Sequence, residues 1–188
     1  MNYPFKIVYK YTLSITIFKV LLITMKAFLY TLFFLITFQS FSQKKQLNSS
    51  DTISKDSLIS FSKNYIGIKY KYASINPKKG FDCSGFVNFV FTHFKVKAPR
   101  SSIDYGAIGI TIHPDSFIIG DAIVFTGTNS KNRKPGHVGI IISNYNEKLQ
   151  FIHSSSNKKN GGVKISNYLD SPYYEKRFLK IVRIVKVS

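Results

Sequence analysis

The chain passes from a loop into a helix at residues 80–87, Gly80-Phe81-Asp82-Cys83-Ser84-Gly85-Phe86-Val87, and this stretch decides the fold. Asp82 suits the N-cap position, because its carboxylate accepts hydrogen bonds from the free amides of a first helical turn. Apolar side chains then recur at helical spacing, and the helix has to end before Pro99. These side chains are Phe86, Val87, Val90, Phe91 and Phe94. The pattern therefore places Cys83 in the first turn of a helix.

One further helix and several strands are expected around this segment. Upstream, residues 57–66 form an amphipathic helix that Gly67 ends, and a loop over residues 69–81 follows. Downstream, four segments have the composition of strands: 122–126, 137–143, 149–153 and 178–187. Helices that precede an antiparallel sheet indicate the α+β class.

Cys83 is the only cysteine, so a disulfide within the chain is excluded. A thiol is nucleophilic when it is ionised, and the free amides and dipole of a helix N-terminus lower the pKa of a thiol. The start of the helix thus predicts a reactive Cys83. Gly85, a poor helix former, would leave room for a substrate backbone. The alternative is that Cys83 is a small residue of the core.

A nucleophilic thiol needs a base and a group that orients the base. His137 begins one predicted strand and His153 ends the next, so a hairpin that pairs them directly has a loop over residues 143–147. That register places Ile141 opposite Leu149, and Gly139 makes space for the Cys83 helix. Directly opposed side chains lie close together, so one imidazole would accept the thiol proton while the other fixes its tautomer. His93 and His113 are interpreted as surface residues.

A zinc site is the competing chemistry, with two histidines, one cysteine and an open fourth position. The sequence lacks the close-spaced pairs CxxC and HExxH that metal sites commonly use. We therefore expect neither a metal nor another cofactor.

The first 42 residues are interpreted as an export signal rather than as part of the fold. They contain no acidic residue, and Met25-Lys26 precedes an apolar run over residues 27–38. Small residues at Ser40 and Ser42 make a cleavage site before Gln43. Met25 is an alternative translation start, and a retained membrane anchor is the alternative fate of the segment. Residues 43–56 are polar and predict a flexible lead-in, and residues 57–188 form one domain.

The charge of the chain is strongly positive, with 27 basic and 9 acidic residues. Removal of the export signal takes away four lysines and no acid, which leaves 23 basic against 9 acidic residues and a net charge of +14. Such a surface favours anionic partners, among them acidic envelope polymers and nucleic acid. Export and the absence of a recognisable nucleic-acid motif argue against nucleic acid.

Several blocks of the sequence, in their order and spacing, resemble the NlpC-type cell-wall cysteine peptidases. They cover about residues 57–180: Gly67-Ile68-Lys69-Tyr70-Lys71-Tyr72, the stretch at 80–87, Pro99-Arg100-Ser101, Gly120-Asp121-Ala122-Ile123-Val124-Phe125, His137-Val138-Gly139-Ile140 and Phe151-Ile152-His153. The resemblance implies a papain-like fold, in which the nucleophile helix packs on an antiparallel sheet. It also implies hydrolysis of peptide bonds in peptidoglycan stem peptides or cross-links.

The same resemblance implies roles for individual residues. Cys83 matches the nucleophile, His137 the base and His153 the residue that orients the base. Tyr70 matches a tyrosine near the nucleophile, and Asp82 and Ser84 match positions that line the substrate cleft.

Two departures concern the cleft wall. Ala73-Ser74 replaces a usual glycine pair, and Asp104 or Tyr105 stands near the place of a usual glutamine.

Two other functions stay open at this point: a non-catalytic envelope-binding module of the same fold, and a basic nucleic-acid-binding protein.

Overall fold

The computed structural model describes residues 21, 23–26 and 52–187. The chain divides into two compact units, Met1–Gln46 and Leu47–Ser188, and only the second carries the predicted domain. Nearly all of the predicted export signal, its alternative as an anchor and its cleavage site near Ser42-Gln43 lie outside the described residues. None of the helices within the described part has the length and apolar character that a membrane span requires.

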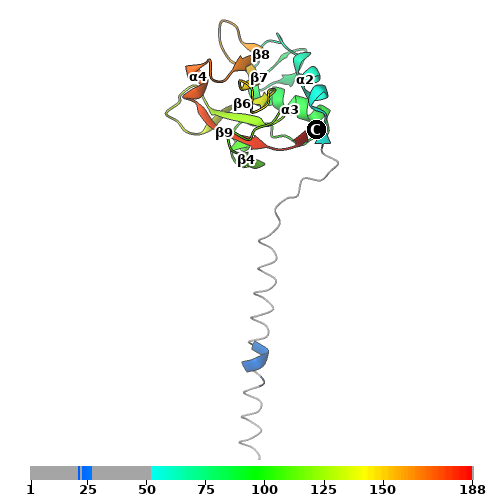
Figure 1. Ribbon diagram of the computed structural model, residues 1–188, viewed down its shortest axis with the longest axis vertical. Helices are drawn as coiled ribbons and strands as arrows, with labels where there is room; N and C mark the ends of the chain where they lie inside the picture. The colour runs from blue at the N-terminus through cyan, green and yellow to red at the C-terminus, as the bar shows by residue number, and fades with distance from the viewer. Residues whose placement is uncertain (1–20, 22, 27–51, 188) are drawn as a thin grey trace, which may run out of the picture. The chain divides into compact units, whose positions relative to one another are not determined.

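A six-stranded sheet forms the centre of the domain (Figure 1). Its order is β4 (Ile110–Ile112), β9 (Phe178–Arg183), β5 (Ala122–Thr126), β6 (Pro135–Ile141), β7 (Gln150–Ser155) and β8 (Gly162–Asn167). All neighbouring strands in it are antiparallel. The α+β, papain-like class predicted from the sequence is therefore confirmed.

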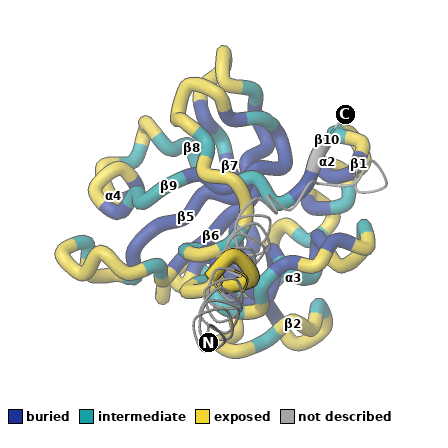
Figure 2. The backbone as a smooth tube through the Cα atoms, turned by 90° about the horizontal axis from the view of Figure 1, so that it is seen from below, coloured by how far each residue is buried: buried dark blue, intermediate teal, exposed yellow. Residues whose placement is uncertain are grey.

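Alternating side chains of the strands fill two separate cores. On one face, Val124, Val138 and Ile152 pack with Phe86 and Val90 of α3 (Cys83–His93). On the other face, buried apolar residues pack around the short helix α4 (Pro172–Glu175): Ile123, Phe125, Ile141, Phe151 and Tyr174. Figure 2 shows the buried backbone of β5 and β6 in the middle of the domain and exposed loops around it.

The domain begins earlier than predicted. Helix α2 spans Lys55–Lys63, and Ser54 caps its first turn. Before it, β1 (Thr52–Ile53) pairs in parallel with β10 (Lys186–Val187), which ties the two ends of the domain together. Residues 52–56 of the predicted flexible lead-in, 43–56, thus belong to regular structure, while residues 43–51 lie outside the described residues.

The predicted strand 178–187 is wrong in its extent, because β9 ends at Arg183 and β10 is a separate strand. Arg183 forms an ion pair with the buried carboxylate of Asp121, with Nε 2.8 Å from Oδ1. This pair joins β9 to the start of β5. The sequence interpretation also missed β4, β8 and α4.

The predicted register of the hairpin is wrong by two residues. Ile141 pairs with Phe151 rather than with Leu149, and Ile140 pairs with Ile152. A shift of two residues keeps every side chain on its face, whereas a shift of one would reverse it. The two histidines therefore still lie on the same face of the sheet.

Replacing Ala73 by glycine is expected to stabilise the domain. Ala73 is exposed and has a φ of 56°, a left-handed conformation that costs a residue with a Cβ about 1–2 kcal/mol. Glycine removes that cost but adds freedom to the unfolded chain, so we expect a net gain below about 1 kcal/mol in urea unfolding. Ala107→Gly is the control, because exposed Ala107 has a φ of −115° and should lose stability. Equal losses in both variants would contradict strain at Ala73.

Candidate active site

The start of α3 holds Cys83 in the position that the sequence predicts. Asp82 is the N-cap, and its Oδ1 accepts a hydrogen bond of 2.6 Å from the amide of Gly85. The lack of a side chain at Gly85 makes room for the protein's own backbone rather than for a substrate, because a Cβ there would lie 2.3 Å from the carbonyl oxygen of Ser74. The loop before the helix therefore packs directly against the first turn of α3.

The two strands beside Cys83 do not pair along their full length. β6 begins at Pro135 and β7 continues to Ser155, yet their pairing ends at Ile140 and Ile152. The chain at the start of α3 contacts both unpaired ends. The Ser154 hydroxyl donates to the carbonyl of Phe81 over 2.8 Å, and the amide of Val138 is directed at the Cys83 sulfur. Cys83 thus adjoins the residue that follows His137.

The thiol of Cys83 is in a less favourable environment for ionisation than its place on a helix predicts. Burial raises its pKa, and the nearby negative charge of Asp82 raises it further. The amides of Ser84 and Val138 act in the opposite direction, by hydrogen bonding to the sulfur. The expected lowering of the Cys83 pKa is therefore wrong, because burial outweighs the helix N-terminus.

His137 and His153 form a hydrogen-bonded pair on the face of the sheet that packs around α4. Nε2 of His137 lies 2.9 Å from Nδ1 of His153, and the two rings are perpendicular. A Cβ on Gly139 would lie 2.7 Å from the Phe151 ring and 3.1 Å from Cβ of His153. Gly139 therefore makes room for β7 and its histidine, and not for the Cys83 helix as predicted.

The hydrogen bonds of His153 fit a pair of tautomers that leaves one nitrogen of His137 unprotonated. Nε2 of His153 lies 3.0 Å from Oγ of Ser166 and 3.3 Å from the hydroxyl of Tyr174. If this Nε2 carries the proton and donates, then Nδ1 accepts the proton of His137 Nε2. Nδ1 of His137 is then the unprotonated nitrogen, free to accept the thiol proton. The hydrogen bonds of the described residues include none between Cys83 and His137, but catalytic hydrogen bonds often tighten only in the Michaelis complex.

Both histidines are held in the neutral form. Burial, together with the smaller effect of the positive charge of Arg177, lowers the pKa of His137 to about 3. Burial also lowers the pKa of His153, followed by the charges of His137, Lys164 and Arg177. A neutral imidazole is the form that accepts a proton, so the pair is available as a base.

The other predicted cleft residues lie near the sulfur of Cys83. Arg100 binds both carboxylate oxygens of Asp82, at 3.0 and 2.6 Å, and its Nη1 lies 3.3 Å from the Ser84 hydroxyl. Tyr70 is half-buried, and its phenol pKa is raised by burial and by the charges of Cys83 and Asp82. Tyr70, Asp82 and Ser84 thus all lie near Cys83.

Sequence reasoning assigned no role to several residues of this site. Tyr105 is fully buried, its hydroxyl donates to the carbonyl of Pro99, and burial followed by the charge of Cys83 raises its pKa. Its place near the replaced glutamine was a signal for it, and the Pro-Arg-Ser block was one for Arg100. Ser166, Tyr174 and Arg177 carried no such signal, since they come from segments that the sequence interpretation left without structure.

A pocket of about 680 Å³ opens beside His137 on the side of α4. Its lining comes from β7, β8, the β7–β8 loop and α4, and it includes Tyr174 and Arg177. Among the described residues, no group of three or more His, Cys, Asp or Glu side chains is arranged to hold a metal ion. The arrangement of Cys83, His137 and His153 supports nucleophilic catalysis by a thiol.

Comparison with known proteins identifies the family of the chain. Residues 67–183 match the model of the NlpC/P60 family, and the chain belongs to that family. Over 141 residues it is 33% identical to the gamma-DL-glutamyl hydrolase of Bacillus subtilis strain 168, covering 75% of this chain and 32% of that protein. Over 123 residues it is 32% identical to the murein DD-endopeptidase MepS/murein LD-carboxypeptidase of Escherichia coli K12, covering 65% of this chain and 58% of that protein.

Solved structures show the same fold. An NlpC/P60 family protein from Bacillus cereus superposes with a TM-score of 0.62 at 26% identity, covering 73% of this chain and 43% of that one. NlpC2 from Trichomonas vaginalis gives a TM-score of 0.60, also at 26% identity, over 76% of this chain and 49% of that one. The chain spans less than three fifths of the length of each of these four relatives.

The buried histidines predict a loss of stability in mild acid. The pKa of His137 is depressed in the folded state, so its contribution is complete above the unfolded value of about 6.5 and is lost as the pH falls toward the folded pKa. Each histidine that gains a proton on unfolding adds a slope on the order of 1 kcal/mol per pH unit. Urea unfolding between pH 7 and pH 4 should therefore show a smaller slope for His153→Gln than for the wild type.

The exposed His113 supplies the control for this measurement, because its side chain is 73% exposed beside Asp115. His113→Gln should keep the wild-type slope. An unchanged slope in His153→Gln would show that His153 titrates as it does in the unfolded chain.

Proposed function

We propose that this domain is a cysteine peptidase that hydrolyses peptide bonds in the stem peptides or cross-links of peptidoglycan. The observation that carries the proposal is the hydrogen bond between His137 and His153 beside the helix start that holds Cys83. The printed names of two relatives, a gamma-DL-glutamyl hydrolase and a murein DD-endopeptidase, refer to different bonds. The substrate class proposed here is therefore the peptide part of the wall as a whole.

The proposed reaction uses the tautomers in which Nε2 of His153 carries a proton and Nδ1 of His137 does not. Nδ1 of His137 accepts the thiol proton as sulfur attacks the carbonyl carbon, and His153 stabilises the charged imidazole through Nε2 of His137. Amides near the sulfur, those of Cys83, Ser84 and Val138, are candidates to bind the oxyanion. His137 then protonates the leaving amine, and the C–N bond breaks to give a thioester. Water, deprotonated by His137, cleaves the thioester, which releases a carboxylate and restores the thiol.

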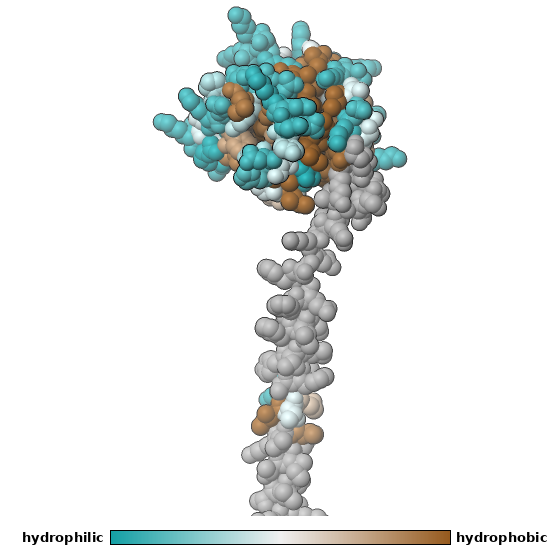
Figure 3. Space-filling model, viewed as in Figure 1, coloured by the Kyte–Doolittle hydropathy of each residue, from teal (hydrophilic) through white to brown (hydrophobic). Residues whose placement is uncertain are grey.

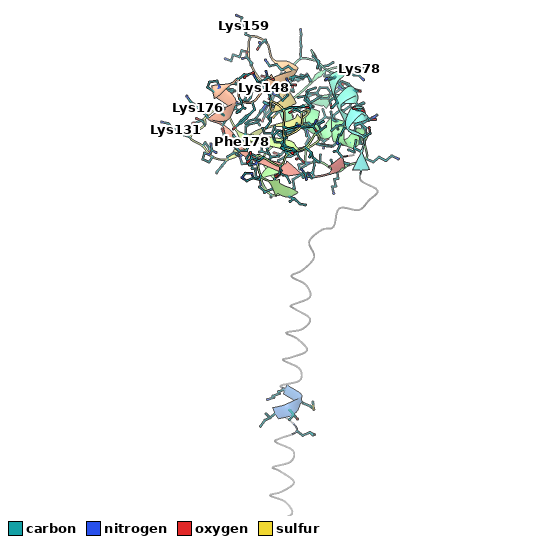
Figure 4. The ribbon with its side chains drawn as sticks, in the orientation of Figure 1. Lys78, Lys131, Lys148, Lys159, Lys176 and Phe178 are labelled. Carbon is teal, nitrogen blue, oxygen red and sulfur yellow. The ribbon has the colours of Figure 1, made fainter. Side chains whose placement is uncertain are left out.

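Export is the second part of the proposal. The support comes from the apolar segment before residue 43 and from the charge of the domain. Figure 3 shows hydrophilic side chains over much of the visible face of the domain. Lys131, Lys159 and Lys176 are exposed and extend outward from it (Figure 4). A surface of this kind favours adsorption to the anionic polymers of a cell envelope.

The first test removes the nucleophile. Cys83→Ala should stay folded, because one small side-chain atom is lost, and it should lower the release of new amino groups from purified peptidoglycan by at least about 10⁴-fold. A chelator should leave the wild-type rate unchanged. Retained hydrolysis by the variant would overturn the cysteine-peptidase proposal. If the wild-type protein binds peptidoglycan but releases no amino groups from it, the result would favour a non-catalytic module.

The second test separates the roles of the two histidines. His137→Ala should lower turnover about 10²–10⁴-fold, the usual range for a general base, and it should raise the apparent pKa of thiol alkylation. His153→Asn keeps an acceptor for the His137 ring, so it should retain more activity than His153→Ala. The rate of Cys83 alkylation against pH is the discriminating measurement, with His113→Ala as a control that leaves the profile unchanged. A shift with His153→Ala but none with His137→Ala would exchange the two roles.

A further inference from the structure

Arg177 carries a buried positive charge that lacks an acidic partner among the described residues. The residue is 5% exposed, and its guanidinium stacks over Tyr173 with Cζ 4.4 Å from the ring centre. Nε donates to the carbonyl of Gly127 and Nη2 to that of Thr126, each over 2.7 Å. The ion pairs within the described part of the chain do not include Arg177. A buried guanidinium that is bound to carbonyls alone has no anion beside it to offset its positive charge.

The third nitrogen of this guanidinium, Nη1, is accessible. Nη1 of Arg177 has no hydrogen bond to another described residue, and none of the described side chains has a nitrogen that is both buried and unbonded. Nη1 is therefore accessible, and Arg177 lines the pocket beside His137. The donor and the charge of Arg177 are thus presented to whatever enters that pocket.

Two lysines make the pocket more positive. Lys164 of β8 pairs with His153 of β7, and Lys158 lies in the β7–β8 loop. The acidic residue of the lining is Asp170, which has its own cation in Lys148, 3.7 Å away, and is mostly turned to solvent. Three cations against one acid that is already paired favour an anionic ligand. The volume of about 680 Å³ is that of a site for a small molecule or a few residues of a peptide.

The place of the pocket indicates which part of a substrate would enter it. This inference rests on the proposed function, in which His137 protonates the leaving amine. His137 lines the pocket and Cys83 does not, while Tyr70, Tyr105 and Arg100 lie on the side of the sulfur. The acyl part of the substrate thus stays with Cys83, and the leaving part lies toward Arg177. We propose that this pocket is a subsite for a free carboxylate on the leaving peptide, bound by Arg177, Lys164 and Lys158.

A pair of synthetic stem peptides tests the subsite. The two peptides differ only in the residue after the scissile bond, which ends in a free α-carboxylate in one and in a carboxamide in the other. The wild type should cleave the carboxylate with a kcat/KM at least about tenfold higher, because hydrogen bonds to charged groups are among the stronger ones. The combined variant Lys158→Gln and Lys164→Gln should bring the ratio of the two rates toward one.

The ratio is the useful quantity, because Lys164 also lies beside His153 and its removal changes the chemistry of both peptides alike. Lys78→Gln is the matched control, since Lys78 is exposed in the turn between Ile75–Asn76 and Gly80–Phe81 and does not line the pocket. It should keep the wild-type ratio. Equal rates for the two peptides in the wild type would overturn the subsite and leave the proposed peptidase activity standing.

If neither peptide is cleaved, the proposed function fails, and binding then decides the subsite by itself. Calorimetry with Cys83→Ala and the two leaving fragments, one with a carboxylate and one with a carboxamide, gives that answer. Tighter binding of the carboxylate fragment, lost in the Lys158→Gln and Lys164→Gln variant, would support the subsite. Equal binding of both fragments, or the absence of binding by either, would overturn it.

Discussion

The interrupted pairing between β6 and β7 is the constraint on which the candidate active site depends. A fully paired ladder would use the amide of Val138 and the space beside Ser154 for contacts within the sheet. Because pairing ends at Ile140 and Ile152, these groups instead contact the chain at Phe81 and Cys83. Cys83 from one layer of the domain thereby meets histidines that face the other layer. Gly85 and Gly139 serve this arrangement, since a Cβ at either position would collide with neighbouring chain atoms.

Burial gives the site its electrostatic character. Burial raises the pKa of Cys83 and lowers that of His137. Both pKa shifts favour a neutral thiol and a neutral imidazole over an ion pair. Asp82 adds to this at the sulfur, although Arg100 binds both of its carboxylate oxygens. The resting site is thus a protonated thiol near an unprotonated imidazole. In the proposed reaction, proton transfer then accompanies attack on the substrate.

The sequence predicts those parts of the site that depend on local chemistry. Asp82 as N-cap, Cys83 in the first helical turn and the shared face of His137 and His153 all follow from capping and from the alternation of strand residues. The register could not follow in this way, because a shift of two residues leaves the alternation unchanged. Ser166, Tyr174 and Arg177 meet the histidines through contacts between distant segments, and no local pattern marks such contacts. The pKa of Cys83 was misjudged for the same reason, since burial is a property of the folded chain.

In the proposed reaction, the positive charges of Arg177 and Lys164 would connect the base, His137, with the leaving part of a substrate. Arg177 acts on His137, and Arg177 and Lys164 both act on His153, each lowering a pKa that burial has already lowered. A carboxylate bound beside them would offset their charge and so raise the pKa of His137 toward the range in which an imidazole accepts a proton readily. The same anion would stabilise the imidazolium that forms when His137 takes the thiol proton. Recognition of a carboxylate in this pocket would therefore act on the rate of the chemical step as well as on binding, since its interaction with the charged ring exists only after proton transfer has begun.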